Sequence, residues 1–338
     1  MTDTPTTTPP TAFRRRRDEA LRVAVVGVGG MGRNHARVYS QMKGVDLVAI
    51  VDPDGARARE VAELYGGSPL TAVEQLDGVD AVSIAAPSVL HARIGADLLA
   101  RGVHCLVEKP LATTREDGEA LIAAADAGGA VLLVGHIERF NPAVRQLKTI
   151  VDSEDIVVLN ARRMSAVSGR ITDVDVVSDL MVHDLDIVRF LMGGEITDVT
   201  ARGVDGPHGP DHVTALLSFT NGRMASLTAS RVTQNQVRSL EVTTRERFYT
   251  VDYPNQELLI YRQGRIGGTA ADDGSYVLDV GTERVFVRRL EPLVEELQHF
   301  VGAARAEHPP EVDGASALAA LDLVWDIQTR LQTVGVGG

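Results

Sequence analysis

The chain has 338 residues, of which 44% are hydrophobic and 24% are charged. These values are typical of a folded protein of about two domains, and they exclude wholesale disorder or a collagen-like fibre. The 34 basic and 46 acidic residues give a net charge of −12, so we expect no nucleic-acid partner, although a local cationic patch could bind an anionic ligand. The single cysteine, Cys105, excludes a disulfide framework and a cysteine-only metal site.

Residues 1–20 are rich in Thr, Pro and Arg, and they are predicted to form a disordered tail. A twin-arginine export signal is the alternative interpretation of Arg14 to Arg17. Such a signal needs an apolar region, but the next apolar stretch, Val23 to Val28, is short and interrupted by glycine. No stretch is long and apolar enough to span a membrane, so we expect a cytoplasmic protein without membrane contact.

Residues 21–135 alternate between short apolar segments and segments of helical composition. This alternation indicates a doubly wound parallel sheet, the Rossmann type of α/β fold. The predicted strands are 21–26, 45–51, 81–85, 103–107 and 131–134, and the predicted helices are 31–42, 54–65, 89–101 and 113–128.

Residues 136–331 have a different pattern, in which short strands follow one another and Asn221-Gly222 marks a hairpin. We expect a second α/β domain with a large, mostly antiparallel open sheet. Its C-terminal helix, at 314–331, is a candidate to pack back on the first domain. The predicted strands are 156–163, 196–204, 213–219, 224–230, 239–244, 247–252 and 258–262, and the predicted helices are 142–152, 177–192, 292–306 and 314–331.

A glycine-rich segment, Gly27-Val-Gly-Gly-Met-Gly32, matches the G-x-G-x-x-G pattern between a predicted strand and a predicted helix. In such a turn the first glycine permits the bend, the second lets a pyrophosphate approach the backbone, and the third allows helix and strand to touch. The N–H groups at the start of the helix then face the phosphates. The predicted dinucleotide-binding residues of this turn are Gly27, Gly29, Gly30, Met31 and Gly32.

Asp52 ends the second predicted strand, at the spacing where a carboxylate accepts hydrogen bonds from the adenosine ribose and repels a 2′-phosphate. NAD is therefore predicted in preference to NADP, although Arg57 and Arg59 nearby keep NADP open. A turn-capping role within Asp52-Pro-Asp54 is the alternative interpretation.

Three further segments complete a family pattern. Ala86-Pro87-Ser88-Val-Leu-His91 follows the third strand, Glu108-Lys109-Pro110 ends the fourth, and Asp179-Leu-Met-Val-His183-Asp184 lies on a predicted helix. Together with the glycine turn, they resemble the glucose–fructose oxidoreductase / inositol dehydrogenase / MocA family of NAD(P)-dependent dehydrogenases over about residues 21–330. Ala86 departs from the family pattern, which often has Thr there.

This resemblance implies a Rossmann domain at 21–135, with NAD as cofactor, and a substrate and oligomerisation domain at 136–331. In this family the open sheet often mediates subunit contacts, so a homodimer or homotetramer is expected. The resemblance also places Glu108 and Lys109 near the nicotinamide, with a cis peptide bond before Pro110. It adds five predicted cofactor-binding residues: Pro87, Ser88, His91, Glu108 and Lys109.

A narrower resemblance, of residues 135–142 and 180–186, is to the branch of the family that acts on UDP-N-acetylglucosamine at sugar carbon 3. An anionic sugar nucleotide needs cations in this acidic chain, and several arginines lie near the start of the second domain. A solvated basic strand end is the alternative interpretation of these arginines. The predicted substrate-binding residues are Lys109, Arg139, Asn141, Arg163, Arg170 and His183.

Oxidation of a secondary alcohol needs a base for the hydroxyl proton and a donor that stabilises the forming oxygen charge. His183 is the candidate base, because imidazole titrates near neutral pH, and Lys109 is the candidate cation. Asp179 precedes His183 by four positions, so the two would share a helix face and the carboxylate could orient the imidazole. The structural alternatives are a core histidine satisfied by Asp179 and a surface ion pair between Glu108 and Lys109.

The favoured function is therefore NAD-dependent oxidation of a small-molecule substrate, a sugar nucleotide, to a keto sugar. The alternatives are an inositol, polyol or free-sugar dehydrogenase of the same family, and a non-catalytic NAD-binding sensor or regulatory protein. No metal site is expected, since His183, Asp184 and Asp186 do not share one face of a helix.

Overall fold

The computed structural model describes residues 19–166, 175–206, 209–262 and 281–334. It divides into two compact units, one of Met1–Gly135 with Leu297–Gly314 and the other of His136–Glu296 with Ala315–Gly338. The helix predicted at 314–331 is present as α8 (Gly314–Arg330) and belongs almost entirely to the second unit. Its packing on the first domain stays a prediction, whereas the loop and half of α7 (Pro292–Ala304) that precede it belong to the first unit.

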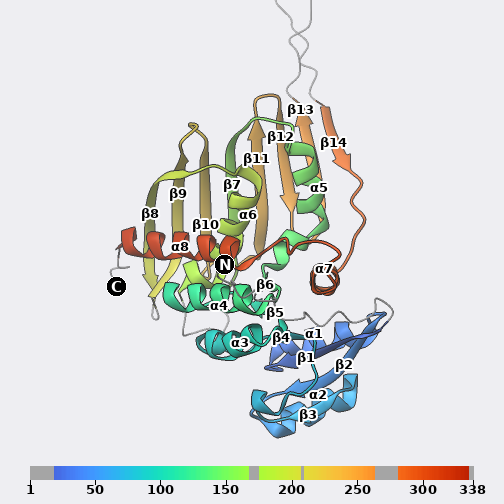
Figure 1. The fold of residues 1–338 in the computed structure, drawn as a ribbon. Helices are drawn as coiled ribbons and strands as arrows, with labels where there is room; N and C mark the ends of the chain where they lie inside the picture. The colour runs from blue at the N-terminus through green and yellow to red at the C-terminus, as the bar shows by residue number, and fades with distance from the viewer. Residues whose placement is uncertain (1–18, 167–174, 207–208, 263–280, 335–338) are drawn as a thin grey trace, which may run out of the picture. The chain divides into compact units, whose positions relative to one another are not determined.

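The first unit contains a parallel six-stranded sheet, which confirms the predicted Rossmann fold (Figure 1). The first strand, β1, lies inside the sheet. The strands β2 and β3 are added on one side of it and β4 to β6 on the other, so the switch point at which such sheets bind ligands lies between β1 and β4. The short strand β3 was not predicted. The sheet order is β3 (Ser68–Leu70), β2 (Val45–Val51), β1 (Leu21–Val26), β4 (Ala81–Ile84), β5 (His104–Glu108) and β6 (Leu132–Gly135).

Helices flank these strands, and their ends lie within two residues of the predicted ones. Asp54 caps α2 by accepting hydrogen bonds from the N–H groups of Ala56 and Arg57, and Gly129 ends α4 in a left-handed conformation. The flanking helices are α1 (Gly30–Gln41), α2 (Gly55–Tyr65), α3 (His91–Ala100) and α4 (Arg115–Gly128).

The second unit contains a nine-stranded, mostly antiparallel sheet, as predicted, in which only β7–β10 and β8–β15 pair in parallel. Strands β14 and β15 at its two edges were not predicted. The order is β14 (Gly281–Val285), β13 (Glu257–Arg262), β12 (Arg247–Asp252), β11 (Val237–Thr244), β7 (Ile156–Met164), β10 (Met224–Ser230), β9 (Gly209–Phe219), β8 (Ile196–Gly206) and β15 (Gln332–Val334).

Helices cover one face of this sheet, where Figure 1 shows α5 (Pro142–Val151), α6 (Val182–Met192) and α8 in front of the strands. Side chains on that face, such as Leu240 and Val242, are fully buried. Side chains on the opposite face stay partly exposed, including Leu216 at 40% and Met224 at 41%. Buried and exposed side chains thus alternate along these strands, as expected of a sheet with one covered and one open face.

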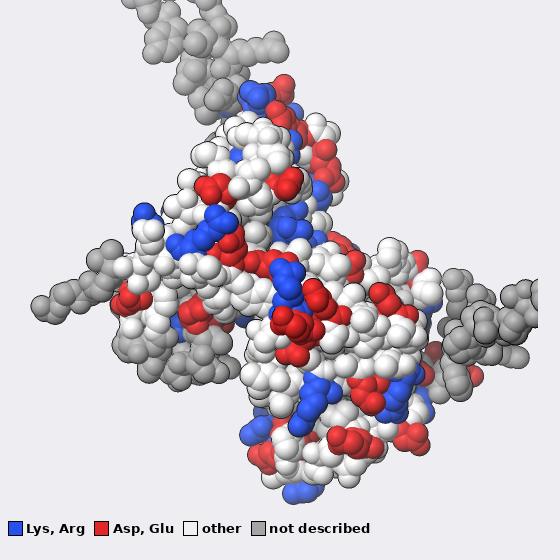
Figure 2. Space-filling view, turned by 60° about the vertical axis from the view of Figure 1, so that its left-hand side comes forward, with Lys and Arg blue, Asp and Glu red and all other residues white. Residues whose placement is uncertain are grey.

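The net charge of −12 does not make every face of the molecule uniformly acidic (Figure 2). On the face shown in Figure 2, acidic and basic side chains are interspersed rather than gathered into one broad patch. Among the described helices, none is both long and apolar enough to cross a membrane.

Candidate functional site

The glycine turn joins β1 to α1 and has the packing that the sequence pattern predicts. Gly27 has a φ of 80°, and a Cβ there would lie 2.6 Å from the backbone nitrogen of Ala86. A Cβ on Gly32 would lie 1.8 Å from the Gly27 carbonyl oxygen, whereas one on Gly29 would meet nothing within 4 Å. Two glycines are therefore needed for packing, and the third leaves open space at the start of α1. This space fits the pyrophosphate of NAD, because helix N-termini bind phosphate through free N–H groups.

Asp52 follows β2 and is only 3% exposed. Its Oδ2 accepts a hydrogen bond of 3.0 Å from the Val28 N–H in the glycine turn, and its Oδ1 accepts one of 2.9 Å from the Asp54 N–H. The Arg57 guanidinium lies 3.4 Å from Asp52 and 3.3 Å from Asp54. Asp52 thus fixes the glycine turn, a contact that sequence reasoning missed. A 2′-phosphate would have to compete with two carboxylates for Arg57, which favours NAD.

Pro87 and Ser88 lie between β4 and α3, in and before the short 3₁₀ turn η2 (Ser88–Leu90). His91, which opens α3, is 1% exposed. Its Nδ1 lies 2.9 Å from the Pro110 carbonyl oxygen, and its Nε2 lies 2.9 Å from the Ala86 carbonyl oxygen. Both ring nitrogens thus face backbone carbonyls, and the assignment of His91 to the cofactor stays a prediction. His91 links the chain that follows β4 to the chain that follows β5.

Glu108 ends β5, and its Oε1 lies 2.9 Å from Nε2 of His35, a fully buried residue of α1. A Cβ on Gly135 would lie 3.0 Å from the Glu108 carboxyl carbon, so glycine is needed beside it. Lys109 follows at the carboxyl end of the strand, and the peptide bond from Lys109 to Pro110 is cis, as the resemblance implied. Sequence reasoning missed His35; the available signal was a histidine on the buried face of α1, one turn after Gly32.

Asp179 lies on a π-helical turn, η4 (Val177–Met181), and His183 lies on the first turn of α6. Asp175 accepts hydrogen bonds from the N–H groups of Val177 and Ser178 at the start of η4, and Gln328 of α8 donates to both Asp175 and Ser178. Orientation of the imidazole by Asp179 stays a prediction, and both side chains are partly exposed.

Arg139 and Arg163 form buried ion pairs on the helix-covered side of the sheet. Arg139 makes two hydrogen bonds of 2.7 Å to Asp186. Arg163 makes bonds of 3.0 and 2.9 Å to Asp184 and one of 2.8 Å to Glu138. Burial opposes the charge of Arg163, but the attraction of Asp184 and Glu138 outweighs it and raises the pKa of this guanidinium. Both cations therefore hold buried carboxylates, a structural role that the sequence did not indicate, and their sequence-based assignment to the substrate stays a prediction.

Asn141 is also engaged within the fold. Its Oδ1 accepts from the Ala143 N–H and caps α5, and its Nδ2 donates to the Tyr253 carbonyl oxygen at 3.2 Å. Asn141 thus has a structural role, and its predicted contact with a sugar hydroxyl stays a prediction. Arg170, the remaining predicted arginine, lies outside the described residues.

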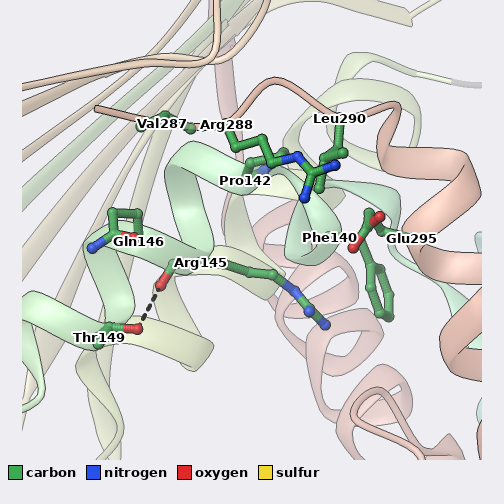
Figure 3. Close-up of a pocket in the computed structure, with 9 residues that line it drawn as sticks. All are labelled: Phe140, Pro142, Arg145, Gln146, Thr149, Val287, Arg288, Leu290 and Glu295. Atoms are coloured by element: carbon green, nitrogen blue, oxygen red, sulfur yellow. Dashed lines mark hydrogen bonds between the residues drawn. The ribbon is translucent and has the colours of Figure 1, made fainter. Parts of the chain in front are cut away.

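A pocket of about 230 Å³ lies in the second unit, beside α5 (Figure 3). Its wall contains Arg145, whose guanidinium lies 4.9 Å from the centre of the Phe140 ring, together with Arg288 and Glu295. None of the predicted site residues lines it. Among the described residues there is also no group of three or more His, Cys, Asp or Glu side chains arranged to hold a metal.

The glycine turn gives a paired prediction. Gly29→Ala should leave the free energy of unfolding within about 1 kcal/mol of the wild type, because its methyl group meets open space, but should weaken NAD binding by about tenfold or more. Gly32→Ala should lower the free energy of unfolding by about 1–3 kcal/mol. Denaturant titration and NAD titration of both variants measure these effects. Unchanged NAD affinity in Gly29→Ala would contradict the assignment of the turn.

The buried ion pairs give a second prediction. Asp186→Asn should lower the free energy of unfolding by about 3–5 kcal/mol, because it leaves the Arg139 charge buried without its partner. Asp326→Asn is the matched control: it breaks the largely exposed pair of Asp326 with Arg330 and should cost about 1 kcal/mol or less. Equal, small effects of both variants in denaturant titration would contradict the structural role of Arg139.

The comparisons with known proteins agree with this geometry. Residues 21–136 match the family model GFO_IDH_MocA, described as an oxidoreductase family with an NAD-binding Rossmann fold, and residues 166–250 match the GFO/IDH/MocA C-terminal domain. A UDP-N-acetylglucosamine 3-dehydrogenase from Acidithiobacillus ferrooxidans is 33% identical over 314 residues, which are 92% of this chain and 97% of that protein. Its solved structure has a TM-score of 0.85 and covers the same shares of both chains.

Other relatives match less of the chain or less closely. An inositol 2-dehydrogenase from Rhodococcus erythropolis is 37% identical over 193 residues, which are 54% of this chain and 56% of that protein. A probable dehydrogenase from Thermotoga maritima shares the fold, with a TM-score of 0.76 at 22% identity over 92% of this chain and 96% of that one. The matches confirm the expected dehydrogenase class and NAD as cofactor, and the chain belongs to the GFO/IDH/MocA family of NAD-binding oxidoreductases.

Proposed function

We propose that this protein oxidises the hydroxyl at carbon 3 of UDP-N-acetylglucosamine, or a closely similar sugar nucleotide, to a ketone. The observation that carries the proposal is the likeness to the UDP-N-acetylglucosamine 3-dehydrogenase, which extends over both units of the chain and not over the Rossmann unit alone. The family motifs at Glu108-Lys109-Pro110 and at Asp179 to Asp184 support it.

The chemistry requires carbon 3 to lose a hydride and its hydroxyl to lose a proton. NAD, when bound, accepts the hydride. In the proposal His183 takes the hydroxyl proton, Asp179 orients the imidazole, and the Lys109 ammonium stabilises the negative charge that develops on the oxygen. The placement of Lys109 at the carboxyl end of a parallel strand supports this role, because doubly wound sheets bind their ligands at that edge.

Glu108 and His35 are proposed to hold the strand end beneath Lys109. The contact between their side chains is buried and joins α1, which starts at the proposed pyrophosphate site, to the end of β5. A shift of either element would therefore move the phosphate site and the ammonium together. We assign both residues to positioning rather than to chemistry.

The open face of the nine-stranded sheet is proposed as the contact between subunits of a homodimer or homotetramer. Its strands present partly exposed apolar residues such as Leu216, Met224 and the neighbouring Phe248 and Tyr261, whose ring centres lie 5.7 Å apart. Large exposed apolar surfaces favour association. The reaction is proposed to take place in the cytoplasm, where sugar nucleotides and NAD are both found.

A second candidate, oxidation of inositol or another uncharged polyol, is supported by the inositol 2-dehydrogenase relatives. The one from Rhodococcus erythropolis is slightly more identical in sequence, at 37%, but its match extends over only 54% of this chain. The second unit is the expected substrate domain. The match to the UDP-N-acetylglucosamine 3-dehydrogenase therefore carries more weight, because it extends over 92% of this chain.

A substrate assay tests the proposal. We expect the purified protein to form NADH from NAD with UDP-N-acetylglucosamine and to form far less with myo-inositol. Turnover with inositol alone would select the polyol dehydrogenase. Bound NADH that no sugar nucleotide or polyol forms or consumes would instead indicate a protein that has lost catalysis.

The proposed roles predict the effect of two variants. Lys109→Ala and His183→Ala should each lower kcat by about 10²–10⁴-fold, with NAD affinity close to that of the wild type. Lys43→Ala, which removes an exposed lysine from the loop after α1, is the matched control and should leave kcat unchanged. Near-normal turnover in either Lys109→Ala or His183→Ala would contradict its assignment.

A further inference from the structure

Arg238 is a cation of the second unit that sequence reasoning did not select. It lies near the start of β11, directly opposite Arg163 of the neighbouring strand β7. Cross-strand partners share a face of the sheet, and the alternation along β11 places Arg238 on the same face as the buried Leu240 and Val242. Its side chain is therefore on the face covered by η4 and α6, which carry Asp179 and His183.

The charge of Arg238 is not neutralised as that of Arg163 is. Arg163 is enclosed by Asp184 and Glu138, whereas no carboxylate among the described residues forms an ion pair with Arg238. Burial lowers the pKa of Arg238, and the neighbouring Arg163 lowers it further, while Glu138, Asp184 and Asp179 act in the opposite direction. A partly buried cation opposite another cation opposes folding, so its presence points to a use in binding.

The chemistry of the guanidinium group indicates what it binds. Its planar fork matches the oxygen atoms of a phosphate or carboxylate, and such charge-assisted pairs are strong where water is excluded. The guanidinium groups of Arg139 and Arg163 already pair with buried carboxylates. Of these three arginines, Arg238 is thus the one whose guanidinium group can donate its hydrogen bonds to a ligand.

The sheet face on which Arg238 lies is covered by η4, which carries Asp179, and this position indicates which phosphate Arg238 binds. Asp179 is one of the charges that act on Arg238, and it is the proposed partner of the base at the carbon 3 hydroxyl. In a sugar nucleotide the phosphate is attached at carbon 1, which is separated from carbon 3 by a single ring carbon. A cation that binds this phosphate must therefore lie within one side chain's reach of the base.

We propose that Arg238 binds the sugar-linked phosphate of the nucleotide sugar and so selects a charged substrate over a free sugar or polyol. This inference rests on the proposed function and adds the residue that distinguishes its two candidate substrates. Arg238 then orients the sugar from carbon 1 while His183 and Lys109 act at carbon 3.

The test uses the variants Arg238→Gln and Arg238→Lys. Arg245→Gln is the matched control, because Arg245 is an exposed arginine that follows the same strand and pairs with Asp155. Calorimetric titration with UDP, at saturating NAD, should show about 10–100-fold weaker binding in Arg238→Gln and an intermediate loss in Arg238→Lys, which keeps the charge without the fork. NAD affinity should stay unchanged in both, as should UDP affinity in Arg245→Gln.

Thermal unfolding separates binding from structure. Arg238→Gln should unfold at the same temperature as the wild type or higher, because it removes a partly buried charge that forms no ion pair with the described residues. A UDP affinity within twofold of the wild type in either Arg238 variant would overturn the inference. A fall in kcat with unchanged UDP affinity would also overturn it, since Arg238 would then act through Asp179.

The wild type distinguishes this failure from failure of the proposed function. If the wild type oxidises UDP-N-acetylglucosamine while Arg238→Gln binds UDP normally, only the role of Arg238 is wrong. If the wild type binds neither UDP nor UDP-N-acetylglucosamine and oxidises inositol, the proposed function and the inference are wrong together.

Discussion

The close backbone contact between the glycine turn and the end of β4 is the constraint on which the cofactor site depends. Gly27 approaches Ala86, and Gly32 approaches Gly27, at distances that leave no room for a Cβ. Asp52 ties the same turn to β2 through the Val28 N–H. The ends of β1, β2 and β4 are thus held together at one loop. His91, and the contact between His35 and Glu108, connect β5 to the same region. The position of Lys109 consequently depends on packing around the glycine turn, although the two are far apart in the sequence.

The second unit is organised by buried charge rather than by close backbone contact. Two bidentate ion pairs fasten α6 to β7 and to η3 (Ile137–Phe140), and Glu138 joins them through Arg163. A pair of this kind is costly to break once formed, because the remaining charge stays desolvated. It can therefore fix the orientation of the helix that bears His183. In the same environment Arg238 forms no ion pair with any residue that the structure describes. Its charge therefore opposes folding, and binding of an anion would offset that cost in free energy.

Much of the architecture could be predicted from sequence, since it follows from local patterns. The alternation of strand and helix and the glycine turn sufficed for the Rossmann sheet, and the short strands with Asn221-Gly222 sufficed for the antiparallel one. Strands β3, β14 and β15 were missed because they have only three to five residues and depend on pairing with a neighbour. The π turn at η4 was missed for a related reason: its composition is that of an ordinary helix.

The candidate site was predictable where residues act through motifs and not where they act through distant partners. Arg139 and Arg163 were assigned to the substrate because they lie close together in sequence. Their partners Asp186 and Asp184 lie on another element, α6. No local pattern in the sequence indicates these ion pairs. His35 and Arg238 were missed because the importance of each depends on a single contact across strands or helices.

The most direct test of the account is a crystal structure with NAD and UDP-N-acetylglucosamine, or its keto product, bound together. The account predicts that the carbon 3 oxygen lies about 2.6–3.2 Å from both the Lys109 Nζ and a ring nitrogen of His183. A bound sugar whose carbon 3 oxygen is beyond the reach of either side chain, or with another carbon facing the nicotinamide, would contradict it.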